Sequence, residues 1–62
     1  MEKKQYNISY YRSDTKTLLE CRQCSHRNYS QAQHEARLYS EWAKYHYDCK
    51  VYFKIETINP IF

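Results

Sequence analysis

Two cysteine and histidine pairs are the residues best suited to chemistry in this chain. Cys21 and Cys24 are separated by two residues, and His46 and Cys49 repeat that spacing further along. Thiolates and imidazoles at this spacing are the half-sites from which structural zinc centres are built. One interpretation is therefore a Cys3His zinc site made by these four side chains.

Two features of the sequence argue against such a zinc site. No glycine follows Cys24, although glycine usually relieves the backbone strain of a tight metal-binding turn. If residues 17–24 form a strand, Cys21 and Cys24 also point to opposite faces of the sheet. We therefore predict no metal ion and no other cofactor. Cys21 is then a small core residue.

A cysteine activated by a histidine could instead act as a nucleophile. Such a thiol needs a nearby imidazole or a helix N-terminus that lowers its pKa, and Cys24 lies just before an expected helix. However, a chain of 62 residues has no room for a walled cleft with an oxyanion hole. We expect no enzyme activity.

Composition and charge exclude further classes of function. The chain contains no glycine, which excludes the glycine-rich loops that bind nucleotide phosphates. The formal net charge of +3 favours acidic partners, either nucleic acid or an acidic protein surface. Residues 1–7 contain no apolar run, and no window approaches the roughly 18 apolar residues of a membrane span. We expect a cytoplasmic protein with free thiols and no membrane contact.

An alternating pattern predicts a β-hairpin at the start of the chain. Residues 5–12 alternate so that one face carries Tyr6, Ile8 and Tyr10. The polar residues 13–16 suit a tight turn, and residues 17–24 form the second strand. On this second strand we place Leu19 and Cys21 in the core and Glu20 and Arg22 outside.

Residues 30–47 form the only segment with helical periodicity, and Asn28 or Ser30 is its expected N-cap. Its buried stripe is predicted to be Ala32, Ala36, Tyr39 and Ala43, flanked by Leu38 and Trp42. Its solvated side is predicted to carry Glu35, Arg37, Glu41 and Lys44. This is the pattern of an amphipathic helix that lies on a sheet.

A third strand follows the helix, with Val51, Phe53 and Ile55 on its core side, and it ends at Asn59–Pro60. The whole chain, residues 1–62, is then one α+β domain. We predict a ββαβ order and a three-stranded antiparallel sheet of order 2-1-3, with one helix packed on one face.

The face of the sheet away from the helix is predicted to be aromatic and basic. It would carry Tyr11, Arg22, Lys50, Tyr52 and Lys54. Tyrosine with arginine or lysine is typical of protein interfaces, and bases also stack on such platforms. The alternative is that a one-layer sheet must expose one face, where these side chains are tolerated without function.

The stretch EARLYSEWA, followed by a tyrosine-rich turn and the strand VYFKI, resembles small phage-encoded host-takeover inhibitors. This type includes the small inhibitor of host RNA polymerase from T7-like phages and several anti-CRISPR proteins. The resemblance implies a helix packed on a small antiparallel sheet that occludes a functional surface of a host machine without doing chemistry. It transfers no functional residue, and the acidic strip by which such inhibitors mimic DNA is absent.

Two hypotheses of function follow. The first is a non-enzymatic phage-type or mobile-element-type inhibitor that binds a host protein or protein–nucleic-acid complex. The alternative is a small basic nucleic-acid-binding module, with or without the Cys3His zinc site. Homodimerisation would also suit so small a core, because it buries more surface.

Overall fold

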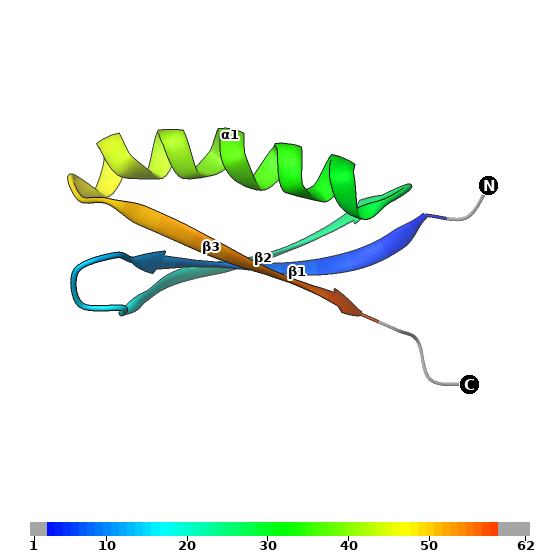
Figure 1. The fold of residues 1–62 in the computed structure, drawn as a ribbon, viewed down its shortest axis with the longest axis horizontal. Coiled ribbons are helices and arrows are strands. Elements are labelled where there is room, and N and C mark those ends of the chain that lie inside the picture. Colours follow the sequence, from blue (N-terminus) through cyan, green and yellow to red (C-terminus); the bar gives the residue numbers. More distant parts are fainter. Residues whose placement is uncertain (1–2, 59–62) are drawn as a thin grey trace.

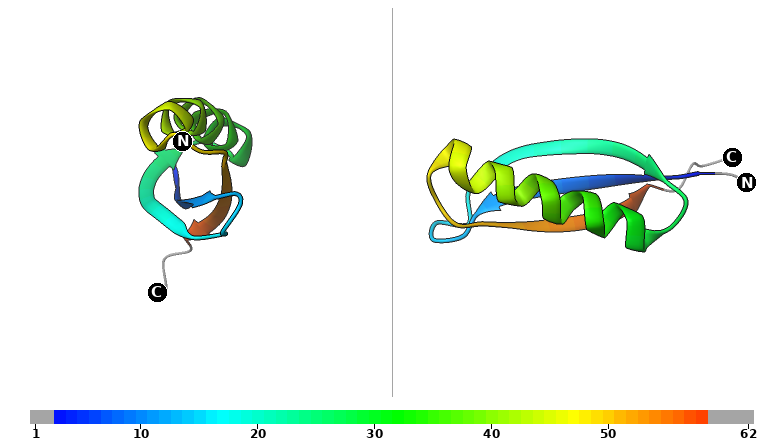
Figure 2. Two further views of the ribbon diagram at one scale, coloured as in Figure 1. Left: turned by 90° about the vertical axis from the view of Figure 1, so that its left-hand side faces the viewer. Right: turned by 90° about the horizontal axis from the view of Figure 1, so that it is seen from above.

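Three strands and one helix form two layers in the computed structural model, which describes residues 3–58 (Figure 1). The elements are β1 (Lys4–Arg12), β2 (Leu18–His26), α1 (Tyr29–Tyr47) and β3 (Val51–Ile58). The strands form an antiparallel sheet of order β2-β1-β3, and α1 covers one face (Figure 2). The predicted fold is confirmed. The expected strand end at Asn59–Pro60 lies outside the described residues.

The core lies between the central strand and the helix. Tyr6, Ile8 and Tyr10 of β1 are at most 2% exposed, as the alternation predicts. Val51, Phe53 and Ile55 of β3 pack beside them, also as predicted. The helix contributes small side chains, because alanine lets its backbone lie close to the sheet. No helix within residues 3–58 is long and apolar enough to span a bilayer.

The buried stripe of α1 differs from the prediction at one position. Ala32, Ala36 and Ala43 are fully buried, but the fourth buried residue is Ser40 and not Tyr39. Ser40 satisfies its hydroxyl by donating to the carbonyl of Arg37 (2.8 Å). Because successive residues of a helix are about 100° apart, Tyr39 and Ser40 lie on either side of the alanine stripe. The smaller Ser40 faces the sheet, and Tyr39 points toward β2, where its hydroxyl donates to Glu20.

Residues other than glycine occupy the cap positions of α1 and the β1–β2 turn. Asn28 is the N-cap of α1 and accepts a hydrogen bond from the backbone N–H of Gln31 (3.0 Å). At the other end, Asp48 adopts a left-handed conformation with φ of 52°. Lys16 does the same in the β1–β2 turn, with φ of 58°. Both residues occupy the region that glycine usually fills, at a steric cost to the backbone.

The register of β2 overturns the predicted assignment of its two faces. Tyr10 pairs with Glu20, but Tyr11 pairs with Leu18, so Leu19 is the extra residue of a bulge. One extra residue moves every later side chain to the other face. The prediction that Cys21 lies in the core and that Glu20 and Arg22 point away from the helix is therefore wrong. Leu19, also predicted to lie in the core, is only partly buried. The strand also continues to His26, beyond its expected end at Cys24.

A first prediction concerns the buried hydroxyl of Tyr10. This oxygen is inaccessible to solvent and has no hydrogen-bond partner among the side chains and backbone of residues 3–58. Removing an unpaired buried hydroxyl relieves a desolvation cost of about 1–3 kcal/mol. We expect Tyr10→Phe to leave the free energy of unfolding unchanged or to raise it by about 1 kcal/mol, measured by urea titration.

The matched control is Tyr39→Phe, which removes a hydroxyl that donates to Glu20 (2.7 Å). That variant should lose stability, by about 0.5–1.5 kcal/mol. If Tyr10→Phe is as destabilising as Tyr39→Phe, the Tyr10 hydroxyl is hydrogen-bonded in solution and the assignment is incorrect.

Candidate functional site

The face of the sheet opposite α1 is not covered by any element of residues 3–58 (Figure 1, Figure 2). We call this surface the open sheet face. Its side chains come from alternate positions of all three strands. It comprises Gln5, Asn7, Ser9 and Tyr11 of β1, Leu18, Cys21, Gln23 and Ser25 of β2, and Tyr52, Lys54, Glu56 and Ile58 of β3.

Three of the five predicted contact residues meet on the open sheet face. Tyr11 and Tyr52 are directly paired across β1 and β3, and their rings stack with centroids 5.1 Å apart and an interplanar angle of 16°. The ammonium of Lys54 lies 5.4 Å from the centroid of the Tyr11 ring, within cation–π range. The result is an ordered aromatic platform at one end of the face.

The remaining surface of this face is mostly polar, apart from Leu18, which pairs with Tyr11 and is 54% exposed, and the half-buried Ile58. The thiol of Cys21 donates to the side-chain oxygen of Asn7 (2.9 Å), and the Ser9 hydroxyl lies 3.7 Å from the same sulfur. Lys54 and Glu56 occupy neighbouring positions of β3, and their charges cancel. The open sheet face therefore has little net charge.

The other two predicted contact residues lie elsewhere. The Arg22 guanidinium lies on the helix side, 4.4 Å from the centroid of the Tyr39 ring, so its expected place on the outward face is wrong. Lys50 precedes β3, and its carbonyl accepts a hydrogen bond from the backbone N–H of Ser13 (2.8 Å). It therefore belongs to the end of the molecule where the β1–β2 turn meets the α1–β3 connection.

A line of polar contacts joins β2 to the side of α1. Glu20 accepts hydrogen bonds from the hydroxyls of Tyr39 (2.7 Å) and Tyr47 (3.0 Å). Burial, and then the bond to Glu20, raise the pKa of Tyr39. For Tyr47 the bond to Glu20 is the main cause of a raised pKa. These contacts hold the C-terminal half of the helix against an edge strand.

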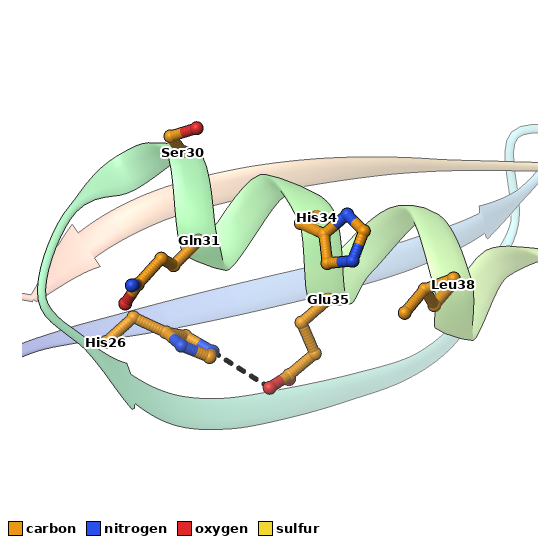
Figure 3. Close-up of a pocket in the computed structure, with 6 residues that line it drawn as sticks. All are labelled: His26, Ser30, Gln31, His34, Glu35 and Leu38. Atoms are coloured by element: carbon orange, nitrogen blue, oxygen red, sulfur yellow. Dashed lines mark hydrogen bonds and ion pairs between the residues drawn. The ribbon is translucent and has the colours of Figure 1, made fainter.

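A second polar cluster lies nearer the start of α1. His26 Nε2 and Glu35 Oε1 are 2.8 Å apart, and Glu35 therefore faces the sheet, contrary to its predicted place on the solvated side. The side chains of His26 and Glu35 point toward each other beneath the helix (Figure 3). The Cys24 thiol belongs to the same cluster, with all three ligand atoms within 4.8 Å of one another. A shallow pocket lies beside it, lined by His26, Ser30, Gln31, His34, Glu35 and Leu38.

The surroundings of Cys24 do not favour nucleophilic catalysis. Burial raises the pKa of this thiol, and the nearby Glu35 carboxylate raises it further. A reactive cysteine requires the opposite shift, toward the thiolate at neutral pH. Both effects favour the neutral thiol of Cys24 over its thiolate.

The predicted Cys3His zinc set does not converge. Cys21 lies on the open sheet face, whereas Cys24 pairs with Tyr6 on the helix side. His46 stacks on Trp42 near the C-terminal end of α1, with ring centroids 4.5 Å apart. Cys49 lies beyond that end of the helix. The Cys3His interpretation is therefore wrong, because Cys21 and Cys24 lie on opposite faces of the sheet. Within residues 3–58 the ligand atoms of Cys21, His46 and Cys49 also belong to no cluster that could hold a metal ion.

An apolar stripe on the outer side of α1 was not predicted from the sequence. Leu38, Trp42 and Tyr45 are 60%, 49% and 88% exposed. Their spacing of four and then three residues puts them on one side of the helix, and that spacing was visible in the sequence. The stripe was not recognised because Leu38 and Trp42 were interpreted as flanks of the buried alanine stripe.

The sheet thus carries an aromatic pair on its open face and a cluster of three potential metal ligands on the side of the helix. Comparisons with protein-family models, with curated proteins and with solved structures found no match.

Proposed function

We propose that this protein is a non-enzymatic inhibitor of the phage or mobile-element type, which acts in the cytoplasm of a bacterial host. It binds and occludes a surface of a host protein or protein–nucleic-acid complex, in the transcription or anti-phage defence machinery. The observation that carries the proposal is the stacked pair Tyr11–Tyr52, with Lys54 beside it, on a sheet face that no element of residues 3–58 covers. The resemblance of the helix-to-strand segment to such inhibitors supports the mode of action.

The tyrosine pair has the properties of an interface anchor. Tyr11 and Tyr52 are half-buried, so their rings are held by the sheet and lose little freedom when a partner binds. Tyrosines dominate the binding energy of many interfaces for that reason. Lys54 adds a cation at the edge of the platform, where an acidic side chain of a partner can pair with it.

The distribution of charge favours a protein partner over direct nucleic-acid binding. A nucleic-acid module gathers its basic residues on one face. Here Arg12 pairs with Asp14, and Lys44 pairs with Glu41. Arg22 lies over Tyr39 on the covered side. The open sheet face offers a polar, aromatic and nearly neutral surface of the kind that another protein covers.

A second prediction tests this face. We expect the double variant Tyr52→Ala/Lys54→Ala to bind the partner at least about 30-fold more weakly, because it removes one ring of the anchor and its cation. The partner is first isolated from a bacterial lysate with the tagged protein, with and without nuclease, and identified by mass spectrometry. Affinity is then measured with the purified partner by surface plasmon resonance.

The matched control is Leu38→Ala/Tyr45→Ala on the exposed stripe of α1, which removes a similar amount of apolar surface elsewhere. Far-UV circular dichroism should show that both variants remain folded. Binding that is lost in the helix variant and kept in the sheet variant would assign the interface to α1 and refute the proposed face.

The same platform supports a second candidate function, a small nucleic-acid-binding module, because bases can stack on Tyr11 and Tyr52 while Lys54 meets a phosphate. Anisotropy titrations with generic single- and double-stranded oligonucleotides discriminate the two. Phosphate contacts release counterions, so an affinity that falls steeply with salt indicates this alternative. No binding at low salt excludes it. Sedimentation analysis of the free protein shows whether it forms the homodimer that its small core favours.

A further inference from the structure

Three potential metal ligands of different chemistry converge between β2 and α1. We propose that Cys24, His26 and Glu35 form a binding site for a tetrahedral transition-metal ion, best matched by zinc. This inference does not depend on the proposed function, because the site lies on the helix side of the sheet and the partner face on the other.

The fold brings these ligands together from two elements. Cys24 and His26 are two residues apart on an extended strand, and this spacing directs both toward the helix. Glu35 lies in the second turn of α1 and points back to the strand (Figure 3). All three residues are partly buried, so each side chain is held by its surroundings before an ion arrives.

The distances suit one small ion. Zinc binds sulfur at about 2.3 Å and nitrogen or oxygen at about 2.0–2.2 Å, so the ligand atoms of a tetrahedral site lie roughly 3.3–3.8 Å apart. The three ligand atoms here lie within 4.8 Å of one another, and His26 Nε2 and Glu35 Oε1 are 2.8 Å apart. Small rotations of the side chains convert this cluster into a coordination shell.

The donor set indicates the kind of ion. A thiolate and an imidazole exclude the hard ions calcium and magnesium, which prefer oxygen ligands. One sulfur, one nitrogen and one carboxylate oxygen are the three ligand types that zinc accepts. On binding, the Cys24 thiol loses its proton to solvent, and the His26–Glu35 contact is replaced by two bonds to the ion. Within residues 3–58 no further cysteine, histidine or acidic side chain joins the group, so water takes the fourth position.

The alternative is that His26 and Glu35 form a simple ion pair and that Cys24 is a small packing residue. The two interpretations differ in what the sulfur of Cys24 does, because only in a metal site does the thiolate form a bond to a metal ion. Cobalt(II) can report that bond, since a tetrahedral thiolate complex has a charge-transfer band in the near ultraviolet and intense visible d–d bands.

The experiment uses the full chain, reduced and freed of metal by chelator, titrated with cobalt(II) and then with zinc. We expect one equivalent of cobalt to bind, with a thiolate charge-transfer band that zinc abolishes. Cys24→Ser should remove the band. Cys21→Ser and Cys49→Ser should retain it, because these thiols lie on the open sheet face and beyond the end of α1.

Zinc affinity, measured by competition with a chromophoric chelator, tests the other two ligands in variants that retain Cys24. Loss of a ligand should weaken binding by more than about 100-fold, since even outer-shell changes cost 10–100-fold. We expect this loss of zinc affinity for His26→Gln and for Glu35→Gln. The control variant His46→Gln should bind zinc as tightly as the unchanged protein. Circular dichroism confirms that each variant is folded. Absence of stoichiometric binding, a band that survives in Cys24→Ser, or one lost in Cys49→Ser would overturn the proposal.

Discussion

Ile8→Ala should remove a large part of the free energy of unfolding and lower the urea midpoint strongly. Ile8 is fully buried at the centre of β1, and it lies in one core cluster with Tyr10 and Ala36. Truncating a buried isoleucine costs about 2–5 kcal/mol, because the surrounding groups fill the cavity only in part. A chain of 62 residues has a total stability of roughly 3–9 kcal/mol. One core substitution can therefore remove most of the free energy of unfolding.

Leu38→Ala is the matched control, because it also shortens an aliphatic side chain but at a site that is 60% exposed. It should change stability by no more than about 0.5 kcal/mol. Urea titrations followed by far-UV circular dichroism compare the two. Equal midpoints for both variants would show that Ile8 does not lie in the core.

The parts of the fold that the sequence predicts are those set by local pattern. Residues 5–12 and 51–55 alternate without interruption, and the structure buries the side chains that this alternation selects. The alanine stripe of α1 predicts which side of the helix lies on the sheet, and Asn28 predicts where it begins. Each of these signals depends on neighbours within one element.

The faces of β2 could not be predicted, because they depend on a bulge that the local pattern does not show. Without the bulge, pairing Tyr11 with Leu18 would put Cys21 opposite Ile8 and bury it, as the hydrophobic pattern suggests. The extra residue Leu19 instead puts Arg22 opposite Ile8. Polar side chains are tolerated there because β2 is an edge strand and because Tyr39 and Glu35, distant in sequence, provide their partners.

The candidate sites also differ in whether the local pattern of the sequence or the tertiary fold brings their residues together. Tyr11, Tyr52 and Lys54 belong to strands with unbroken alternation, and the prediction placed them together correctly. The Cys3His set depended on spacing along the chain, which does not imply proximity in space. Glu35 could not be connected with Cys24 before the register of β2 was known, although the two-residue offset of Cys24 and His26 on a strand was a usable signal.

The second large effect is a loss of stability at alkaline pH, caused by tyrosines that lie between the sheet and α1. Folding raises the pKa of Tyr10 strongly, mainly through burial. It also raises the pKa of Tyr39 through burial and the bond to Glu20, and that of Tyr47 chiefly through Glu20. The Cys24 thiol is shifted upward as well. All four groups are therefore harder to deprotonate in the folded state.

The sign of the effect follows from proton linkage. A group whose folded pKa is raised stabilises the fold fully below its unfolded pKa and loses that contribution as pH rises through the folded value. The unfolded values are 9.0 for Cys24 and 10.0 for the tyrosines. We expect the urea midpoint to be nearly constant from about pH 7 to 8.5 and to fall steadily from about pH 9 to 11.

Two variants separate this mechanism from a general effect of high pH. Tyr10→Phe removes the group with the largest shift, so its urea midpoint should fall less steeply than that of the unchanged protein. Glu20→Gln removes the charge that opposes deprotonation of Tyr39 and Tyr47, and should also flatten the decline. Tyr45→Phe is the matched control, because Tyr45 is 88% exposed and its loss should leave the pH dependence unchanged. A decline of the same slope in all four proteins would show that these buried and hydrogen-bonded hydroxyls do not control alkaline stability.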